Sequence, residues 1–169
     1  MEVDEAIRTR RTHKAYRPDP VGRELLDQLF ELARWAPNHH LTNPWRFRVV
    51  GPLELDRLKV AAGPEAGAKL NRAPTLVVCS AKLGGDPRED EEDLHATAVA
   101  AFIVLLAAHD RGLAGYWRTP EVLREPEGRA AVGLGADERF VGLLHLGSPV
   151  QQRPAPERAP AAAVASYLD

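Results

Sequence analysis

The spacing of apolar residues predicts four short or medium helices. From Arg23 to Trp35, leucine, phenylalanine and alanine recur every three or four positions, which is typical of a helix with one buried face, and Pro37 ends it. Shorter segments with helical composition or end signals lie at 4–10, 54–62 and 127–132. We therefore expect one amphipathic helix that packs on a core and three minor helices.

A fifth, longer helix is predicted from Arg88 to Asp110. It begins with an acidic segment, contains the longest apolar run of the chain at 98–108, and ends before Gly112. Because no polar face interrupts this run, the helix must be covered on all sides, and we expect a second subunit to cover part of it. The run is much shorter than the roughly 20 residues that span a bilayer, so no membrane association is predicted.

Three segments have the pattern of strands. Residues 45–50 alternate aromatic or apolar side chains with arginine, whereas 74–80 contains an apolar run and 140–146 is mainly apolar. Residues 112–119 are expected to form a turn and a short extended segment. The proline-containing tail at 152–163 lacks periodicity and predicts an extended arm. Since helices and strands do not alternate regularly, an α+β layer structure is favoured over a doubly wound parallel sheet.

Composition fits one globular domain over residues 1–169. The chain has 44% hydrophobic and 27% charged residues, close to the globular average, and its 18.5 kDa suffice for a sizeable core. A net charge of −2 provides no field for a polyanion, so nucleic acid is not an expected partner. The single cysteine, Cys79, excludes a disulfide framework within the chain and is expected to be a buried, inert thiol. The acidic N-terminal residues have no apolar signal region, which favours a cytoplasmic location.

Several common types of site lack their patterns. Neither a Walker loop nor a strand followed by Gly-x-Gly-x-x-Gly is present, and there is no Gly-x-Ser-x-Gly turn. A single Glu92-x-x-His95 lacks the second copy that a di-metal bundle site needs. His39 and His40 are adjacent, and adjacent side chains usually point apart. We therefore predict no metal site and no serine hydrolase chemistry.

Three polar segments carry the candidate chemistry. Arg10, Arg11, Thr12 and Lys14 place three cations and a hydroxyl at a helix end, which suits one phosphate group, although by itself the cluster is also typical of a solvated basic turn. The loop at 36–45 is rich in hydrogen-bonding side chains, and 115–119 sets two aromatics beside an arginine. Together they indicate a site for a flat, phosphorylated ligand.

These segments resemble the nitroreductase family of FMN-dependent oxidoreductases, and within it the compact YdjA-like branch. Residues 10–16 read Arg-Arg-Thr-His-Lys-Ala-Tyr and are similar to the family's Arg-Arg-Ser/Thr-x-Arg/Lys-x-aromatic opening. The loop from Ala-Pro at 36–37 to Asn-Pro-Trp-Arg-Phe at 43–47 is similar to its Ala-Pro to Gln-Pro-Trp-x-Phe segment. Gly-Tyr-Trp-Arg-Thr at 115–119 and Leu-Gly-Ser-Pro at 146–149 match two later motifs. The matches occur in the family's order and span nearly the whole chain.

The resemblance implies a nitroreductase-like α+β fold, with a mainly antiparallel central sheet flanked by helices, in a homodimer that binds FMN at the subunit interface. It also implies a ping-pong reaction in which NADH or NADPH reduces the flavin and a nitroaromatic, quinone or similar acceptor oxidises it, without a protein nucleophile. The cofactor-binding residues that it implies are Arg10, Arg11, Thr12, Lys14, His39, Asn43, Trp117, Arg118 and Thr119.

Two positions depart from the family pattern. Asn43 stands in place of the usual Gln and is one methylene shorter, so its contact with the cofactor is expected to pass through water. Arg153 does not align with the basic residues that many members carry near the C-terminus. Lys14 or Arg118 is the candidate for tuning the flavin electrostatically. Two alternatives remain open, namely an FMN enzyme that acts on another acceptor class, such as enoyl or halogenated compounds, and a flavin-binding module without turnover.

Overall fold

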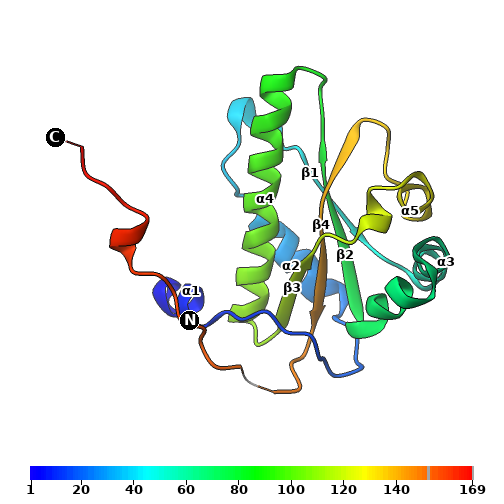
Figure 1. Cartoon of the computed structure of the whole chain (residues 1–169), viewed down its shortest axis with the longest axis horizontal. Coiled ribbons are helices and arrows are strands. Elements are labelled where there is room, and N and C mark those ends of the chain that lie inside the picture. The colour runs from blue at the N-terminus through cyan, green and yellow to red at the C-terminus, as the bar shows by residue number, and fades with distance from the viewer. Residues whose placement is uncertain (152, 169) are drawn as a thin grey trace.

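A four-stranded antiparallel sheet forms the centre of the protein (Figure 1). The computed structural model describes residues 1–151 and 153–168. The strand order is β1-β2-β4-β3, and all three neighbouring pairs are antiparallel. This arrangement confirms the expected α+β class. The strands are β1 (Trp45–Val49), β2 (Thr75–Lys82), β3 (Ala114–Arg118) and β4 (Glu138–Gly147).

Helices cover both faces of the sheet, and each face has its own core. One face packs against α2 and α4, and the opposite face packs against α3 and α5 (Figure 1). Helix α1 lies near the end of α4, outside these two layers. The helices are α1 (Val3–Thr9), α2 (Arg23–Ala33), α3 (Pro52–Ala68), α4 (Pro87–Asp110) and α5 (Pro126–Ala131).

Strand β2 shows why its sequence is continuously apolar. Val77 and Cys79 contribute to the core under α2 and α4, whereas Leu76 and Val78 contribute to the core under α3 and α5. Successive side chains of a strand point to opposite faces, so a strand with two covered faces has no polar side. Burial raises the pKa of the Cys79 thiol to about 12, which agrees with the predicted inert, buried cysteine.

The connection between α3 and β2 differs from the sequence prediction. The predicted helix at 54–62 extends farther in the structure, because α3 continues to Ala68 and is followed by a short 3₁₀ turn, Lys69–Arg72. The helical path breaks once, at Gly63, whose φ of +75° belongs to the left-handed region that glycine adopts without strain. Pro64 then starts the second helical part, where its missing N–H leaves no helical bond unmade.

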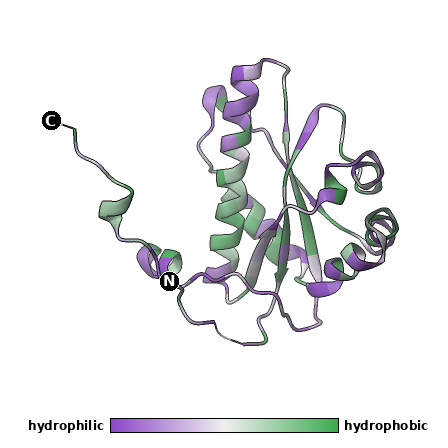
Figure 2. Ribbon diagram, viewed as in Figure 1, coloured by the Kyte–Doolittle hydropathy of each residue, from purple (hydrophilic) through white to green (hydrophobic). Residues whose placement is uncertain are grey.

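Helix α4 has the start and the apolar centre that the sequence predicted. The Asp86 carboxylate accepts hydrogen bonds from the backbone N–H groups of Arg88 at 2.9 Å and Glu89 at 3.1 Å, which caps the helix. Figure 2 shows that the middle of α4 is hydrophobic on its visible side. By length and composition alone α4 could cross a membrane, but half of its most apolar 18-residue window is buried against the rest of the protein. Core helices often meet this criterion.

The tail after β4 forms the extended arm that the sequence predicted, with a short 3₁₀ turn at Ala161–Ala163. Gln152, the first residue of that predicted segment, lies outside the described residues. The arm runs away from the sheet in Figure 1. Its end carries three apolar side chains that are more than 80% exposed in this single chain, namely Val164, Tyr167 and Leu168.

One partly buried ion pair joins three strands at the end of the sheet. Arg48 on β1 contacts both carboxylate oxygens of Glu138 on β4, with 2.7 Å between Nη1 and Oε2, and Ser80 on β2 donates to the same carboxylate. Burial alone would raise the pKa of Glu138, but the hydrogen bonds from Arg48 and Ser80 and the charge of Arg48 hold this pKa below its ordinary value. Arg48 and Glu138 are therefore both ionised, and their pair links β1, β2 and β4.

We expect Glu138→Gln to lower the free energy of unfolding at pH 7 by about 2 kcal/mol, because Arg48 would lose its counterion in a partly exposed setting. The pKa of Glu138 is lower in the folded state than in the unfolded chain. The contribution of Glu138 to stability is therefore complete above the unfolded pKa of about 4.3 and is lost as pH falls through the lower, folded pKa. Urea unfolding at pH 7 and pH 3.5 measures both effects. Glu65→Gln removes an exposed pair with Lys69 on α3 and should change nothing. Equal losses in both variants would contradict the role of Glu138.

Candidate functional site

The N-terminal basic segment runs beside the edge strand β3. Thr12 forms an isolated bridge with Gly115, and the backbone N–H of His13 donates to the Gly115 carbonyl at 3.2 Å. Farther along, Tyr16 bridges to Pro149 just after β4. The fold therefore brings together two of the three polar segments that the sequence singled out, 10–14 and 115–119, together with the late Leu-Gly-Ser-Pro motif.

Four arginines lie in or within charge range of residues 10–13, and we call them the basic cluster: Arg10, Arg11, Arg153 and Arg158. The Arg11 side chain donates to the Pro154 carbonyl at 3.3 Å, which ties the C-terminal arm to the N-terminal segment. Burial, and then the charges of Arg11 and Arg158, lower the pKa of Arg10. Among the described residues, neither Arg10 nor Arg11 forms a salt bridge with a carboxylate. The fold thus concentrates like charges that an anion would neutralise.

Sequence reasoning found only part of this cluster. The motif identified Arg10 and Arg11, but Arg153 did not align with the C-terminal basic residues of the family. In the structure, Arg153 lies within charge range of His13. Arg158 belongs to none of the motifs found in the sequence. Arg153 and Arg158 lie in an arm without periodicity, so the local sequence does not predict their position. The hydrogen bond from Arg11 to the Pro154 carbonyl shows that this arm lies beside the N-terminal segment.

The loop between α2 and β1 has an unusual backbone. His40, Leu41 and Asn43 have φ values of 49°, 52° and 48°, in the left-handed region that residues other than glycine seldom adopt. Two hydrogen bonds hold this shape, because the Asn43 N–H donates to the Asn38 side chain at 2.9 Å and the Thr42 hydroxyl donates to Asp93 of α4 at 2.6 Å. Strain held in place by such bonds is common at binding sites.

The same backbone displays the loop's side chains. Leu41 and Trp35 are about three-quarters exposed and border a hollow of about 400 Å³ that Asn38 and Asn43 also line. The expectation that the adjacent histidines point apart is wrong, since the ring centroids of His39 and His40 lie 3.9 Å apart. The left-handed conformation of His40 turns its ring back toward its neighbour. Even so, the described residues contain no group of three His, Cys, Asp or Glu side chains suited to a metal.

This loop and the basic cluster lie at opposite ends of α4 (Figure 1). Thr42 is bonded to Asp93 near the start of α4, whereas Thr9, just before the basic segment, lies 2.8 Å from His109 in the last turn. At 1.5 Å per residue, these anchor points are about 24 Å apart along the helix. One chain therefore does not bring His39 and Asn43 to the phosphate-type site at Arg10, Arg11 and Thr12.

The third candidate segment is divided between the two faces of the sheet. Trp117 lies against Gly142 on the side of α2 and α4, and its indole N–H donates to the Val141 carbonyl at 3.2 Å. Arg118 points to the other face and donates to the Lys69 carbonyl at 3.2 Å. Thr119 follows the strand and is exposed, as are Thr12 and Lys14. Trp117 and Arg118 therefore face different surroundings, although they are neighbours in the motif.

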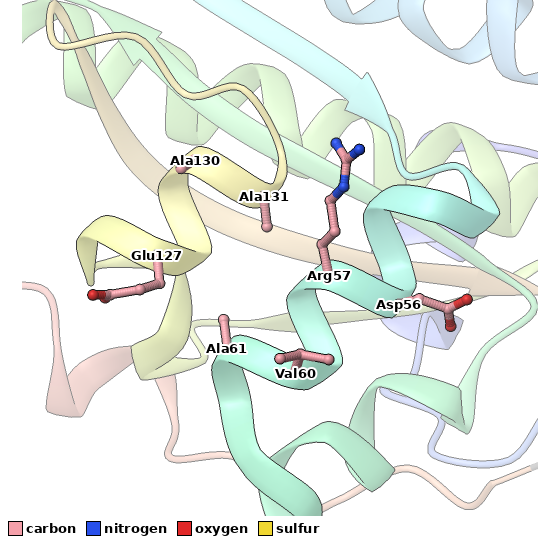
Figure 3. Close-up of a pocket in the computed structure, with 7 residues that line it drawn as sticks. All are labelled: Asp56, Arg57, Val60, Ala61, Glu127, Ala130 and Ala131. Carbon is pink, nitrogen blue, oxygen red and sulfur yellow. The ribbon is translucent and has the colours of Figure 1, made fainter.

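A larger hollow lies elsewhere, between α3 and α5, and has a volume of about 790 Å³ (Figure 3). Val60, Ala61 and Ala131 lie between the two helices, while the charged ends of Asp56, Arg57 and Glu127 point in different directions. Binding sites with specificity have converging polar groups. This hollow has none and contains no residue of the candidate site.

Comparison with known proteins identifies the family to which the chain is similar. A profile described as "Nitroreductase family" matches residues 7–63. The chain is 30% identical over 159 residues to Escherichia coli YdjA, covering 85% of each protein, and 26% identical to Bacillus subtilis YfhC, covering 91% of this chain and 88% of YfhC. Both relatives are named for an NAD(P)H nitroreductase activity.

Solved structures show the same fold. A nitroreductase-like protein from Bacillus cereus superposes with a TM-score of 0.90 at 23% identity, over 100% of this chain and 97% of that one. A nitroreductase-type protein from Desulfovibrio desulfuricans, solved in complex with FMN, superposes with a TM-score of 0.80 at 26% identity, over 99% and 97% of the two chains.

Proposed function

The chain belongs to the nitroreductase family, and from this premise we propose that it is an FMN-dependent oxidoreductase that uses NADH or NADPH to reduce nitroaromatic, quinone or similar acceptors. The names of YdjA and YfhC and the FMN complex of the Desulfovibrio protein support the proposal. The observation that carries it for this chain is the basic cluster, in which Arg10 lies within charge range of Arg11 and Arg158 and neither Arg10 nor Arg11 has a carboxylate partner among the described residues. That charge pattern suits the phosphate of FMN.

The residues of the basic segment have separate roles in this proposal. Arg10 and Arg11 hold the phosphate by charge-assisted hydrogen bonds, and the exposed hydroxyl of Thr12 adds a donor. Lys14 is exposed beside them and is placed to stabilise negative charge at the flavin ring. Bound FMN supplies the hydride chemistry. Trp117, Arg118 and Thr119 are proposed to close the site, with Trp117 and Arg118 acting from different faces of β3.

We further propose a homodimer in which His39 and Asn43 reach the FMN of the partner subunit. In a single chain these residues lie at the wrong end of α4, about 24 Å from the anchor of the basic segment. A two-fold axis that packs α4 against a second α4 in the opposite direction brings the loop of one chain to the basic cluster of the other. The uncovered side of α4 supports this packing, because Val99 and Phe102 are each 39% exposed.

We expect Phe102→Glu to convert the dimer into a monomer, because a carboxylate would be buried in the α4 contact. Sedimentation velocity of the purified protein measures this effect. Val60→Glu is the matched control, since Val60 is 84% exposed on α3, on the opposite face of the sheet. A Phe102→Glu protein that stays dimeric would contradict the proposed interface.

The visible spectrum after FMN reconstitution tests the function itself. The protein should retain FMN through gel filtration, and anaerobic NADH or NADPH should bleach the bound flavin. A nitroaromatic or a quinone should then reoxidise the flavin and restore the oxidised spectrum. If neither reoxidises the flavin but an enoyl or halogenated compound does, the enzyme acts on that other class of acceptor. Retained flavin that neither nucleotide bleaches would indicate a binding module. Failure to retain FMN would overturn the proposal.

A further inference from the structure

Two histidines lie within reach of the basic cluster and have no part in the roles given above. His109 is in the last turn of α4, with its Nε2 atom 2.8 Å from the Thr9 hydroxyl oxygen. That hydroxyl also contacts the Glu5 carbonyl at 2.6 Å, and a carbonyl only accepts, so donation from Nε2 of His109 to Thr9 satisfies both contacts. In this arrangement the neutral ring carries its proton on Nε2, and Nδ1 is able to accept a second proton without breaking the bond to Thr9.

His13 stands in the middle of the basic segment. Its backbone is held beside β3 by the bond to Gly115, and its half-buried imidazole lies within charge range of Arg153 and His109. In the sequence, His13 stands between Thr12 and Lys14, two of the residues that we propose bind the cofactor. His13 thus joins the N-terminal segment, the C-terminal arm and the end of α4 in one group of basic side chains.

The charges that face His109 come from three elements. Arg10 and Arg11 of the N-terminal segment oppose its protonation, whereas Glu5 of α1 and its neighbour Asp110 favour it. Asp110 is already paired with the N-terminal amine at 3.0 Å. Burial and the two arginines prevail, and the pKa of His109 lies below its ordinary value.

The same balance holds for His13, whose pKa is lowered by burial, by Arg153 and by His109. Both rings are therefore neutral at pH 7 to 8 in the absence of an anion. A phosphate dianion among the arginines would cancel the repulsion that keeps them neutral, so the binding of phosphate and the binding of protons favour each other.

We propose that His13 and His109 belong to the phosphate-binding site and take up protons when a phosphate monoester binds to the basic cluster. The inference rests on the proposed FMN function and adds two residues and a pH dependence to it. Proton uptake makes the affinity for FMN fall as pH rises above 7, by about tenfold per pH unit for each proton taken up. Riboflavin, which has no phosphate, should bind without this dependence.

Calorimetric titration of FMN into the flavin-free protein tests the inference at pH 7.8. At this pH the FMN phosphate is already a dianion, because its second pKa is about 6. Titrations in Tris and in HEPES, whose ionisation enthalpies differ, report the number of protons exchanged. We expect an uptake of about one proton per FMN or more and none for riboflavin.

Three substitutions separate this role from a structural one. His13→Gln and His109→Gln should each reduce the uptake, and glutamine at position 109 still offers an N–H to Thr9. His95→Gln, on the exposed start of α4, is the control and should leave the uptake unchanged. FMN binding without proton uptake, or with equal uptake in all three variants, would overturn the inference and leave the proposed function intact. The absence of FMN binding would overturn both.

Discussion

Arg10→Ala is expected to weaken FMN binding about 30-fold at low ionic strength without unfolding the protein. Charge-assisted hydrogen bonds to a phosphate contribute about 1.5–3 kcal/mol, and Arg10 is held in position by its half-buried place 5.8 Å above the ring of Phe102. The neighbouring guanidinium groups of Arg11, Arg153 and Arg158 retain part of the phosphate affinity. Titration of FMN fluorescence against flavin-free protein measures the loss.

Two controls show whether the loss concerns the phosphate. Riboflavin should bind equally well to Arg10→Ala and to the original protein. Arg23→Ala removes the same charge from α2, where the side chain is 93% exposed, and should leave FMN affinity unchanged. If Arg10→Ala weakened riboflavin as much as FMN, Arg10 would act on the ring or on the fold instead of on the phosphate.

A second large effect is expected from His145, at the centre of β4. The residue is fully buried, and neither ring nitrogen has a hydrogen-bond partner among the described residues. Burial, together with the charges of Arg118 and Arg72, lowers its pKa to about 3. Because the unfolded chain binds a proton near pH 6.5, this group's contribution is complete above pH 6.5 and is lost as pH falls toward 3. The loss amounts to about 2.5 kcal/mol between pH 7 and 4.5.

His145→Leu should remove this part of the acid sensitivity, because leucine has a similar volume and no proton to bind. Urea unfolding of both proteins at pH 7 and pH 4.5 gives the two differences in stability. The decrease on acidification should be smaller by about 2.5 kcal/mol in His145→Leu. His95→Leu, at an exposed position of α4, should keep the original decrease. An identical decrease in His145→Leu would show that His145 is not the group that limits stability in acid.

The sequence by itself determined most of the elements, because their signals are local. The arginine alternation of β1, the continuous apolar run of β2 and the acidic start of α4 each reflect the environment of one segment, and the structure confirms them. The resemblance of 10–16 and 36–47 to family motifs was equally local. It identified the nitroreductase family before any contact between segments was known.

Other features of the candidate site depended on contacts between distant segments. The strand order β1-β2-β4-β3, the bridge from Thr12 to Gly115 and the bond from Arg11 to Pro154 have no counterpart in any single stretch of sequence. The opposite directions of Trp117 and Arg118 follow from the pleat of β3 and from which helices cover each face.

Tertiary structure also decided how the site is divided. The family motifs assign His39, Asn43 and Arg10 to one cofactor site at a subunit interface, and the structure shows that α4 separates them by about 24 Å in a single chain. The same packing brings His13, His109 and Arg153 into one group of basic side chains that no motif contains. Local sequence determines which face of an element is apolar. Only the burial of those faces against one another determines which polar side chains meet at their edges.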